Sequence, residues 1–373
     1  MTETPAPFEL AAGFPPADAA HWRALVEKAL AGAPFEKLVA KTYDSISVKP
    51  LYTEADWPAA RDASGAPGAA PFTRGAAAIK DQAAPWLIRQ AVSRPDPEAA
   101  NKEALADLEG GVHSIEFKLD RGDRRGVRIA SARDVALALE GIMLDLAPLA
   151  LDGGADAAAA ALFADYAEAR NLGEAAFAFN LDPLAALLAG QAAPLTEAIA
   201  FAKRSAGAFP NATSLRADAR PAHEAGGSEA QELGYALAAM TALLRAGEAG
   251  GMAPEALARQ CLVTFAIGPD IHLELAKLRA ARTLFARLLE ACGATPEARA
   301  VELHAVTGAR MMTRRDAWVN LIRVTAAGFA AGVGGADVVT TAPLTEARGQ
   351  PTPFARRIAR NTQILLLEES NLG

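Results

Sequence analysis

The sequence has few cysteines, no excess of basic residues and no long apolar run, and each shortage excludes a class of protein. The two cysteines, Cys261 and Cys292, cannot form a disulfide framework and indicate a reducing compartment, which we expect to be the cytoplasm. The net charge of -7 argues against nucleic acid or an anionic membrane as the main partner. No stretch of about 18 uncharged apolar residues predicts a membrane-spanning helix. The start, MTETPAPFEL, lacks the basic and apolar parts of a secretory signal.

The common catalytic and ligand-binding motifs are missing as well. No two of the five histidines have the spacing of metal ligands, so we expect no metal site. No glycine-rich phosphate loop and no nucleophile elbow opens a helix after a strand. The function must therefore be inferred from the organisation of the chain and from longer segments.

The composition is that of a globular protein, with 51% apolar and 22% charged residues. Residues 1–84 are predicted to form an N-terminal segment with a helix over Ala17–Ala31, an extended arm over Lys41–Trp57 and a linker over residues 58–82. Residues 85–373 are predicted to form the main domain.

Short apolar runs alternate with helical patterns along the main domain. This alternation is typical of a parallel sheet with helical crossovers and predicts a TIM-type (β/α)8 barrel. The expected strands are Val112–Leu119, Ala147–Leu151, Ala175–Asn180, Thr213–Asp218, Leu262–Ile267, Ala300–Ala305 and Val338–Thr341. The expected helices include Glu98–Leu108, Ala155–Ala169, Ser228–Ala246, Ile271–Cys292 and Arg315–Ala331. A barrel has eight strands, so either one strand escapes the pattern or the chain ends before the last one.

The helix predicted from Ile271 has the clearest local signals. Asp270 is a suitable N-cap and Gly293 a suitable stop. Its apolar stripe comprises Leu273, Leu278, Ala281, Leu284 and Leu288. Its basic residues are Lys277, Arg279, Arg282 and Arg287. Charge runs on helices usually face solvent, so we expect an outer helix with a solvated basic face.

Charged residues alternate with apolar ones in two of the predicted strands. Glu116 and Lys118 lie on one face of the first, and Arg216 and Asp218 on one face of another. The apolar face must pack against the helices, so the charged face is expected to point to the barrel axis. These four residues could line a polar active site. We favour the other reading, in which they pair with one another and fill the interior.

The pair His223–Glu224 follows the Thr213–Asp218 strand, at the end of the barrel where enzymes of this fold carry their chemistry. A histidine in this place could act as a general acid. A loop His–Glu pair is also often only solvated, so the pair remains a fallback site rather than a predicted one.

Several longer segments resemble the methylmalonyl-CoA mutase family, whose members use adenosylcobalamin. The stretch KTYDSISVKPLYTEADW looks like the N-terminal arm of the family, PWLIRQ like the segment leading into the barrel and LEGGVHSIEF like its first strand. The stretches EAGGSEAQELGY, AKLRAARTLFARLL and ARNTQILLLEES look like later parts of the barrel. The resemblance implies a barrel domain and a radical rearrangement of an acyl-CoA.

The sequence departs from the catalytic pattern that this resemblance implies. Catalytic chains carry a tyrosine shortly before the PWLIRQ-like segment, whereas this chain reads AIKDQAAPW. They carry Tyr-His where Arg220 and Pro221 stand here, and His223 falls two residues later. At about 3.3 Å per residue, that shift is too large for the same hydrogen bond.

The cobalt-binding pattern of the family is also altered. Cobalamin domains carry Asp-x-His-x-x-Gly, but Asp270 and His272 are followed by Leu275 instead of glycine. We therefore interpret His272 as a structural residue at the start of a helix. The cobalamin domain that lies beyond the barrel in the family is expected to be absent from this chain, which ends at Gly373.

These losses resemble the non-catalytic small subunit of a heterodimeric mutase. The resemblance implies no catalytic residue and no cofactor in this chain, with adenosylcobalamin and acyl-CoA bound by a catalytic large subunit. One alternative is a catalytic acyl-CoA mutase barrel whose cobalamin domain is a separate chain, with His223 and Glu224 as acid and carboxylate. Another is a module that binds a CoA ester without chemistry.

The arm is the expected contact with the large subunit. Its large apolar residues are Tyr43, Ile46, Val48, Leu51 and Tyr52. The arm is too short to form its own core, and a monomer rarely leaves such a patch exposed. These side chains are expected to bury against another chain, as the resemblance implies, or against the barrel of this chain as an internal strap.

Overall fold

The computed structural model describes residues 13, 18–57, 64–82, 84–122, 125–188, 190 and 195–372. The chain divides into two compact units, Met1–Arg61 and Asp62–Gly373, so residues 64–82 group with the barrel. Ala17, the first part of the expected linker, Ala83 of the AIKDQAAPW stretch and the final glycine lie outside the described residues.

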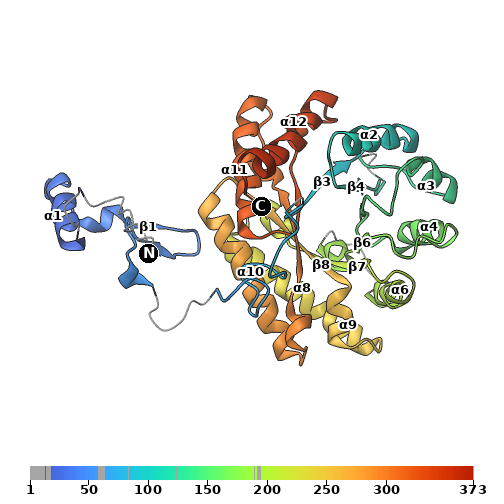
Figure 1. Ribbon diagram of the computed structural model, residues 1–373, viewed down its shortest axis with the longest axis horizontal. Helices are drawn as coiled ribbons and strands as arrows, with labels where there is room; N and C mark the ends of the chain where they lie inside the picture. Colours follow the sequence, from blue (N-terminus) through green and yellow to red (C-terminus); the bar gives the residue numbers. More distant parts are fainter. Residues whose placement is uncertain are drawn as a thin grey trace, which may run out of the picture. The chain divides into compact units, whose positions relative to one another are not determined.

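The second unit is a closed barrel of parallel strands, which confirms the predicted TIM-type fold. Its strands are β3 (Leu87–Val92), β4 (Ser114–Lys118), β5 (Leu149–Asp152), β6 (Phe177–Leu181), β7 (Thr213–Asp218), β8 (Cys261–Ile267), β9 (Glu302–Thr307) and β10 (Val338–Thr340). They follow one another in sequence order around the barrel, and β10 pairs with β3 to close it. Figure 1 shows the helices arranged around these strands.

The strand that the sequence pattern did not reveal is β3. Arg89 and Gln90 are both buried there and interrupt its apolar run, so the segment did not look like a strand. The assignment of LEGGVHSIEF as the first strand is therefore wrong, because it forms the second strand of the barrel. The possibility that the chain stops before the last strand is also wrong, since all eight are present.

Helices follow the strands and cover the barrel. They are α2 (Pro97–Glu109), α3 (Ala132–Ala138), α4 (Ala157–Glu168), α5 (Pro183–Leu188), α6 (Leu195–Ala208), α7 (Arg220–Glu224), α8 (Glu229–Ala249), α9 (Pro254–Arg259), α10 (Ile271–Ala291), α11 (Ala317–Gly334) and α12 (Pro353–Ile364). Side-chain caps fix several of their starts: Asp96, Asp156 and Asp270 each accept a backbone N–H of the first turn. These caps thus set where α2, α4 and α10 begin.

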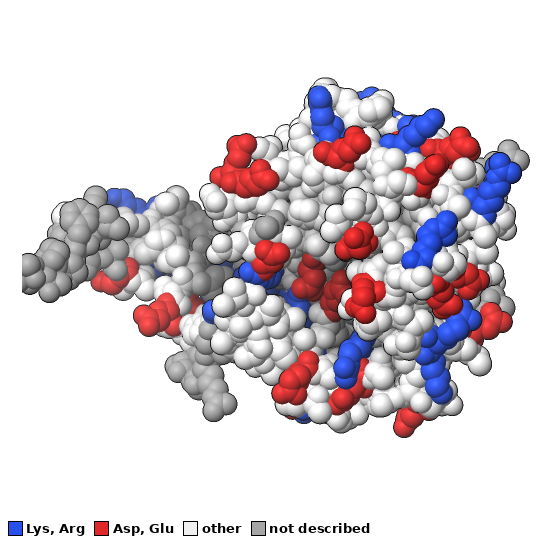
Figure 2. All heavy atoms as spheres, turned by 45° about the vertical axis from the view of Figure 1, so that its right-hand side comes forward, with Lys and Arg blue, Asp and Glu red and all other residues white. Residues whose placement is uncertain are grey.

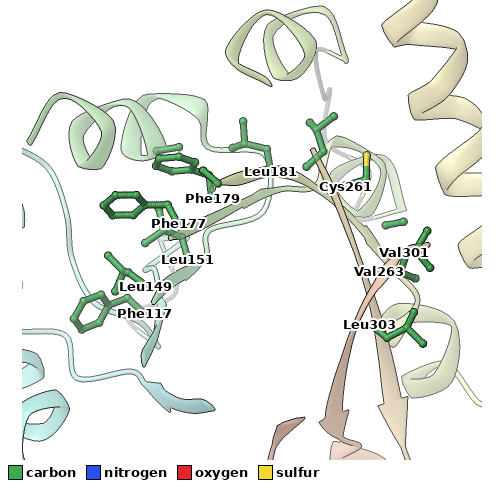
Figure 3. Close-up of a cluster of buried hydrophobic side chains, with 14 of the residues drawn as sticks. Phe117, Leu149, Leu151, Phe177, Phe179, Leu181, Cys261, Val263, Val301 and Leu303 are labelled. Carbon is green, nitrogen blue, oxygen red and sulfur yellow. The ribbon is translucent and has the colours of Figure 1, made fainter. Parts of the chain in front are cut away.

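The core lies between the strands and the helices. Alternate residues of each strand, such as Phe117, Phe177 and Phe179, are buried in one apolar cluster. Figure 3 shows part of this layer along the strands. Phe179 meets Phe201 of α6 edge to face, with ring centroids 5.0 Å apart. With the apolar half of each strand turned to the helices, the other half faces the axis.

The structure contradicts the prediction that the basic residues of helix α10 face solvent. Lys277 and Arg282 are only 2% and 1% exposed, so the solvated basic face is wrong for these two residues. Lys277 Nζ lies 2.7 Å from Glu232 of α8, and Arg282 donates hydrogen bonds to the carbonyl oxygens of Val301 and Gly335. The predicted apolar stripe is also only partly right, because Leu278 and Ala281 are buried but Leu284 is 38% exposed. The buried side of α10 is the one that packs against α8 and α11.

Helix α11 has the length and apolar content of a membrane span, with a mean hydropathy of 1.2. Half of its residues are buried within the barrel unit, as is usual for a core helix of a soluble protein. It packs against α10 and α12.

The first unit is small, and its described residues form no buried core. It contains α1 (Ala19–Ala29) and a two-stranded antiparallel hairpin of β1 (Ala40–Lys41) and β2 (Ser47–Val48). The expected extended arm thus folds back on itself in its first half. None of residues 18–57 is buried. Packing inside this unit contributes little to its stability, since burial is the main stabilising term in folding.

Candidate functional site

A cluster of charged side chains lies at the carboxyl ends of β4, β5 and β7, inside the barrel. Arg216 is its centre and is 1% exposed. Its Nη2 atom lies 2.7 Å from Oδ1 of Asp152 and 3.3 Å from Oδ2 of Asp218, and its Nη1 atom lies 3.9 Å from Oε1 of Glu116. The two-residue spacing along each strand places all these side chains on the axial face.

A second layer of arginines completes the cluster. Arg220 of α7 donates from Nε to both carboxylate oxygens of Asp218, at 2.9 and 3.0 Å, and from Nη2 to Asp152 at 3.2 Å. Arg121 donates to Asp152 at 2.7 Å. Burial alone would raise the pKa of Asp152, but Arg216, Arg220 and Arg121 hold that pKa well below its usual range. Asp152 is therefore ionised and shared by three arginines.

A cavity of about 350 Å³ opens above this cluster. Among the residues that line it are Glu116, Lys118, Arg216, Asp218, Thr307 and Glu346. Lys118 is half-buried at its rim, with Nζ 3.4 Å from Oε1 of Glu346. The structure thus brings together the four residues expected to fill the barrel: Glu116, Arg216 and Asp218 form the floor and Lys118 stands above it.

The barrel axis below the cavity is occupied by buried polar side chains that the sequence did not single out. Arg89 of β3 donates from Nε to Ser114 at 2.9 Å, and His304 of β9 lies 2.8 Å from the hydroxyl of Thr340. Both side chains are buried. Burial, followed by the positive charge of Arg89, holds the pKa of His304 well below its usual range, so the imidazole is neutral. Arg89 could have been predicted as an axial residue only if β3 had been recognised as a strand in the sequence.

Asp182 is a further buried carboxyl that sequence reasoning missed. It follows β6, and its Oδ1 accepts the backbone N–H groups of Leu184 and Ala185 at 3.1 and 2.9 Å. Burial, and then the neighbouring charge of Asp218, raise the pKa of Asp182 to about 6. Asn180, two residues before it, has a φ of 53° at a break in the strand register. Such irregularities in strands are common near functional sites. The Asn-x-Asp-Pro sequence at this point was the signal from which the irregularity could have been predicted.

His223 and Glu224, the fallback pair, have different partners, although both side chains approach Gly308. His223 is 3% exposed, and its Nδ1 lies 3.4 Å from Oε2 of Glu232, away from the axial cluster. It lines a separate cavity of about 620 Å³ with residues such as Asp270 and Arg310. Glu224 lines the axial cavity, and its Oε1 accepts the backbone N–H of Ala309 at 2.7 Å. The two side chains therefore face different cavities.

His272 and the arm residues lie at the surface. His272 is exposed inside the first turn of α10, whose N-cap is Asp270. Tyr43 is 95% exposed, and the other four arm residues, Ile46, Val48, Leu51 and Tyr52, are between 39% and 60% exposed. Among the described residues, no group of three or more His, Cys, Asp or Glu could hold a metal ion.

The outer surface offers no broad region of one charge in the view of Figure 2. Acidic and basic side chains are interspersed over that face of the molecule. This mixed surface agrees with the modest net charge of -7.

The comparisons with known proteins agree on one family. The family profile described as methylmalonyl-CoA mutase matches residues 41–373. The chain is 43% identical to the methylmalonyl-CoA mutase small subunit of Streptomyces virginiae, over 98% of this chain and 60% of that protein. It is 36% identical to the probable small subunit of Mycobacterium bovis, over 91% of this chain and 55% of that protein.

A third relative is the small subunit of Propionibacterium freudenreichii subsp. shermanii, 34% identical over 99% of this chain and 59% of that protein. The chain thus spans between 55% and 60% of the length of these three relatives. The profile covers the arm and the barrel, and the fold is the one that the sequence segments implied. The chain belongs to the methylmalonyl-CoA mutase family.

Proposed function

We propose that this chain is the non-catalytic small subunit of a heterodimeric methylmalonyl-CoA mutase. The catalytic large subunit would interconvert methylmalonyl-CoA and succinyl-CoA, and this chain would stabilise it. Three similar proteins are named as small subunits, which supports the assignment. The reducing environment suited to the free cysteines Cys261 and Cys292 favours a cytoplasmic location.

The observation that carries the proposal is the filled barrel axis. An acyl-CoA threaded along the axis would have to displace Arg216, which is 1% exposed and tied to Asp152 and Asp218. Breaking a buried ion pair costs about 3–5 kcal/mol, because the remaining charge is left without compensation. The axis is therefore suited to holding the barrel together and poorly suited to admitting a substrate.

We also propose that adenosylcobalamin, which supplies the radical chemistry of the family, is held by the partner. In this chain His272 lies inside a continuous helix, and position 275 is Leu rather than Gly. A histidine in regular helix, without a glycine that lets a flat macrocycle approach, does not fit a lower cobalt ligand. The described segment from Asp270 to Leu275 thus does not fit a cradle for the cofactor.

The N-terminal unit is the proposed docking segment for the large subunit. Its described residues include no buried side chain, and five large apolar residues of the arm are exposed. An apolar surface of this kind marks an interaction site. Tyrosine is among the residues that contribute most to binding at interfaces, so Tyr43 and Tyr52 are the main candidates.

Assembly is the direct test of this proposal. The chain is co-expressed with the tagged large subunit of its source organism, and the complex is isolated on the tag. We expect the two chains to elute together in equal amounts. Failure of the chain to co-purify, with both proteins folded, would overturn the subunit assignment.

The alternative is a catalytic barrel with a separate cobalamin chain. It requires an axis open to a pantetheine arm and a shared role for His223 and Glu224. The paired charges of Arg216, Asp152 and Asp218 weigh against it. So do the different partners of His223, which lies near Glu232, and of Glu224, which accepts from Ala309.

A further inference from the structure

The seam where the barrel closes contains a cavity that the proposed function does not use. Because β10 pairs with β3, the helices that follow these strands, α12 and α2, are neighbours. Figure 1 shows them on either side of β3. A cavity of about 630 Å³ lies between them. That volume is in the usual range for small-molecule sites.

Cations dominate the polar residues of this cavity. Its basic residues are Arg94, Lys102, Arg356, Arg357 and Arg360, and its acidic residues are Glu103 and Asp107. Five cations against two carboxylates leave a local charge of about +3 in a chain whose net charge is -7. The potential of the cavity therefore favours an anionic ligand.

The inner part of the cavity is a closed ion-pair network. Asp107 accepts hydrogen bonds from Arg356 Nε and from Arg360 Nη1, each at 3.1 Å. Glu103 accepts from Arg94 Nε at 3.0 Å and lies 3.4 Å from Arg356. The two carboxylates are thus taken up by three arginines, which form a rigid floor.

The outer cations are available to a ligand. Lys102 of α2 and Arg357 of α12 are exposed, and neither has an ion-pair or hydrogen-bond partner among the described residues. The Nε edge of Arg360 is buried against the backbone of Gly110, so Arg360 belongs to the floor and not to the outer cations. Arginine and lysine donors on facing helices can bind the oxygens of a phosphate together.

The rest of the lining is apolar and aromatic. Ala99 and Ala106 of α2 leave room on one side, and Phe354 of α12 stands on the other. The Arg357 guanidinium lies 5.5 Å from the centroid of the Phe354 ring, and Trp318 meets that ring edge to face at 6.3 Å. Phe354 is 46% exposed, so part of its ring is open to a ligand. A flat ring would find an aromatic surface here beside the cations.

We propose that this cavity binds a nucleoside phosphate. The phosphate would lie between Lys102 and Arg357, and the base would pack against Phe354. The proposal does not depend on the subunit role, since it concerns the outside of the barrel rather than its axis.

Calorimetric titration of the chain with ADP, with adenosine and with inorganic phosphate tests the proposal. We expect saturable binding of ADP that weakens with added salt, weaker binding of phosphate and no binding of adenosine. Coenzyme A as a fourth titrant distinguishes a free nucleotide from one carried on a larger ligand. No saturable heat with ADP or coenzyme A at millimolar concentration would overturn the proposal.

Matched variants locate the site. The double variant Lys102→Glu/Arg357→Glu should weaken ADP binding by at least about tenfold, because two charge contacts to the phosphate become repulsive. Phe354→Ala should weaken binding of ADP but not of phosphate. Arg245→Glu on the exposed face of α8 is the control for a general charge effect.

The four substituted residues are all exposed, namely Lys102, Arg245, Phe354 and Arg357. The melting temperatures of the variants should therefore stay close to that of the parent chain, so a loss of binding can be told apart from a loss of folding. ADP binding that survives the double variant, or that falls equally in the Arg245→Glu control, contradicts the assignment of the site. Saturable binding of a poly-glutamate peptide in place of ADP would also contradict it, and would show that the cavity takes an acidic protein segment instead.

Discussion

Arg216 of β7 and Asp152 of β5 form an ion pair of 2.7 Å across the barrel, with strand β6 between the two strands that carry them. The pair links positions 64 residues apart in the sequence. Together with Asp218 and Arg220 it occupies the place through which an axial ligand would pass. The same four side chains therefore stabilise the barrel and close it.

Removing the charge of Asp152 should destabilise the barrel strongly. Asp152→Asn removes the nearest carboxylate from the buried Arg216 and leaves Asp218 at 3.3 Å and Glu116 at 3.9 Å, so the free energy of unfolding should fall by about 3–5 kcal/mol. Urea denaturation followed by circular dichroism measures this change. Glu116→Gln is the matched control, because Glu116 is 3.9 Å from Arg216 and accepts no hydrogen bond within the described residues. Its cost should be about 1 kcal/mol, and equal losses in the two variants would show that the network is not centred on Asp152.

The stability should fall in acid because of the same network. Arg216, Arg220 and Arg121 lower the pKa of Asp152, and Arg220 with Arg216 lower that of Asp218, against the opposing effect of burial. Both carboxylates are therefore ionised in the folded state at a pH where they would be protonated in the unfolded chain. Their contribution is present above the unfolded pKa of about 3.9 and is lost as the pH falls toward the folded values. The free energy of unfolding, measured from pH 6 down to pH 3, should show this loss, and its dependence on pH should be weaker in Asp152→Asn. A free energy of unfolding that does not change with pH in the parent chain would contradict this role of the two carboxylates.

Asp182 should act in the opposite sense. Burial and Asp218 raise its pKa to about 6, so the folded state favours the protonated form. Its contribution is present below the unfolded pKa of about 3.9 and is lost as the pH rises through 6. Asp182→Asn keeps an oxygen that can cap α5 but removes the charge, so it should stabilise the chain at pH 7.5 by roughly 2 kcal/mol and at pH 4 very little. Denaturation at the two pH values gives the comparison, and a change that is the same at both would show that Asp182 does not titrate in this range.

Lys277 offers a comparison of two charged residues on one helix. Lys277 lies 2.7 Å from Glu232 and 2.6 Å from Glu274, and all three side chains are buried. Lys277→Ala should cost about 3–5 kcal/mol, since two carboxylates lose their counter-charge. Arg279, two residues further along α10, is exposed. Arg279→Ala should change the free energy of unfolding by less than about 0.5 kcal/mol, and a similar loss in both variants would contradict the burial seen here.

The arm should affect assembly rather than folding of the barrel. Replacing Tyr43 and Tyr52 by alanine should weaken binding to the large subunit by a few kcal/mol, the scale of aromatic hot spots. The melting of the barrel should stay nearly unchanged. Titration of the two purified subunits, with differential scanning calorimetry of this chain alone, separates the two effects. Normal assembly together with much earlier melting would identify the arm as an internal strap.

The sequence predicted the barrel because seven strands have apolar runs that alternate with helices. Glu116 and Arg216, from the charged faces of β4 and β7, lie 3.9 Å apart. It missed β3 because the buried polar residues Arg89 and Gln90 break the apolar pattern. It missed Asp152, which follows an apolar run, because one carboxylate at the end of a strand does not show which arginines will surround it.

The burial of Lys277 and Arg282 was hidden for a related reason. Their partners Glu232, Val301 and Gly335 come from other parts of the chain, and helical spacing alone cannot bring them into view. Likewise, the separation of His223 from Glu224 depends on the short helix α7, which turns neighbouring side chains toward different cavities. Pairwise contacts between distant segments thus decide which charged residues are structural.

The measurement that tests the central proposal most directly is turnover by the isolated chain. The purified protein is supplied with adenosylcobalamin and methylmalonyl-CoA, and succinyl-CoA is measured, with the assembled heterodimer as the positive control. The account predicts no succinyl-CoA from this chain alone and rapid formation by the heterodimer. Succinyl-CoA formed by this chain alone, at a rate comparable with that of the heterodimer, would contradict it.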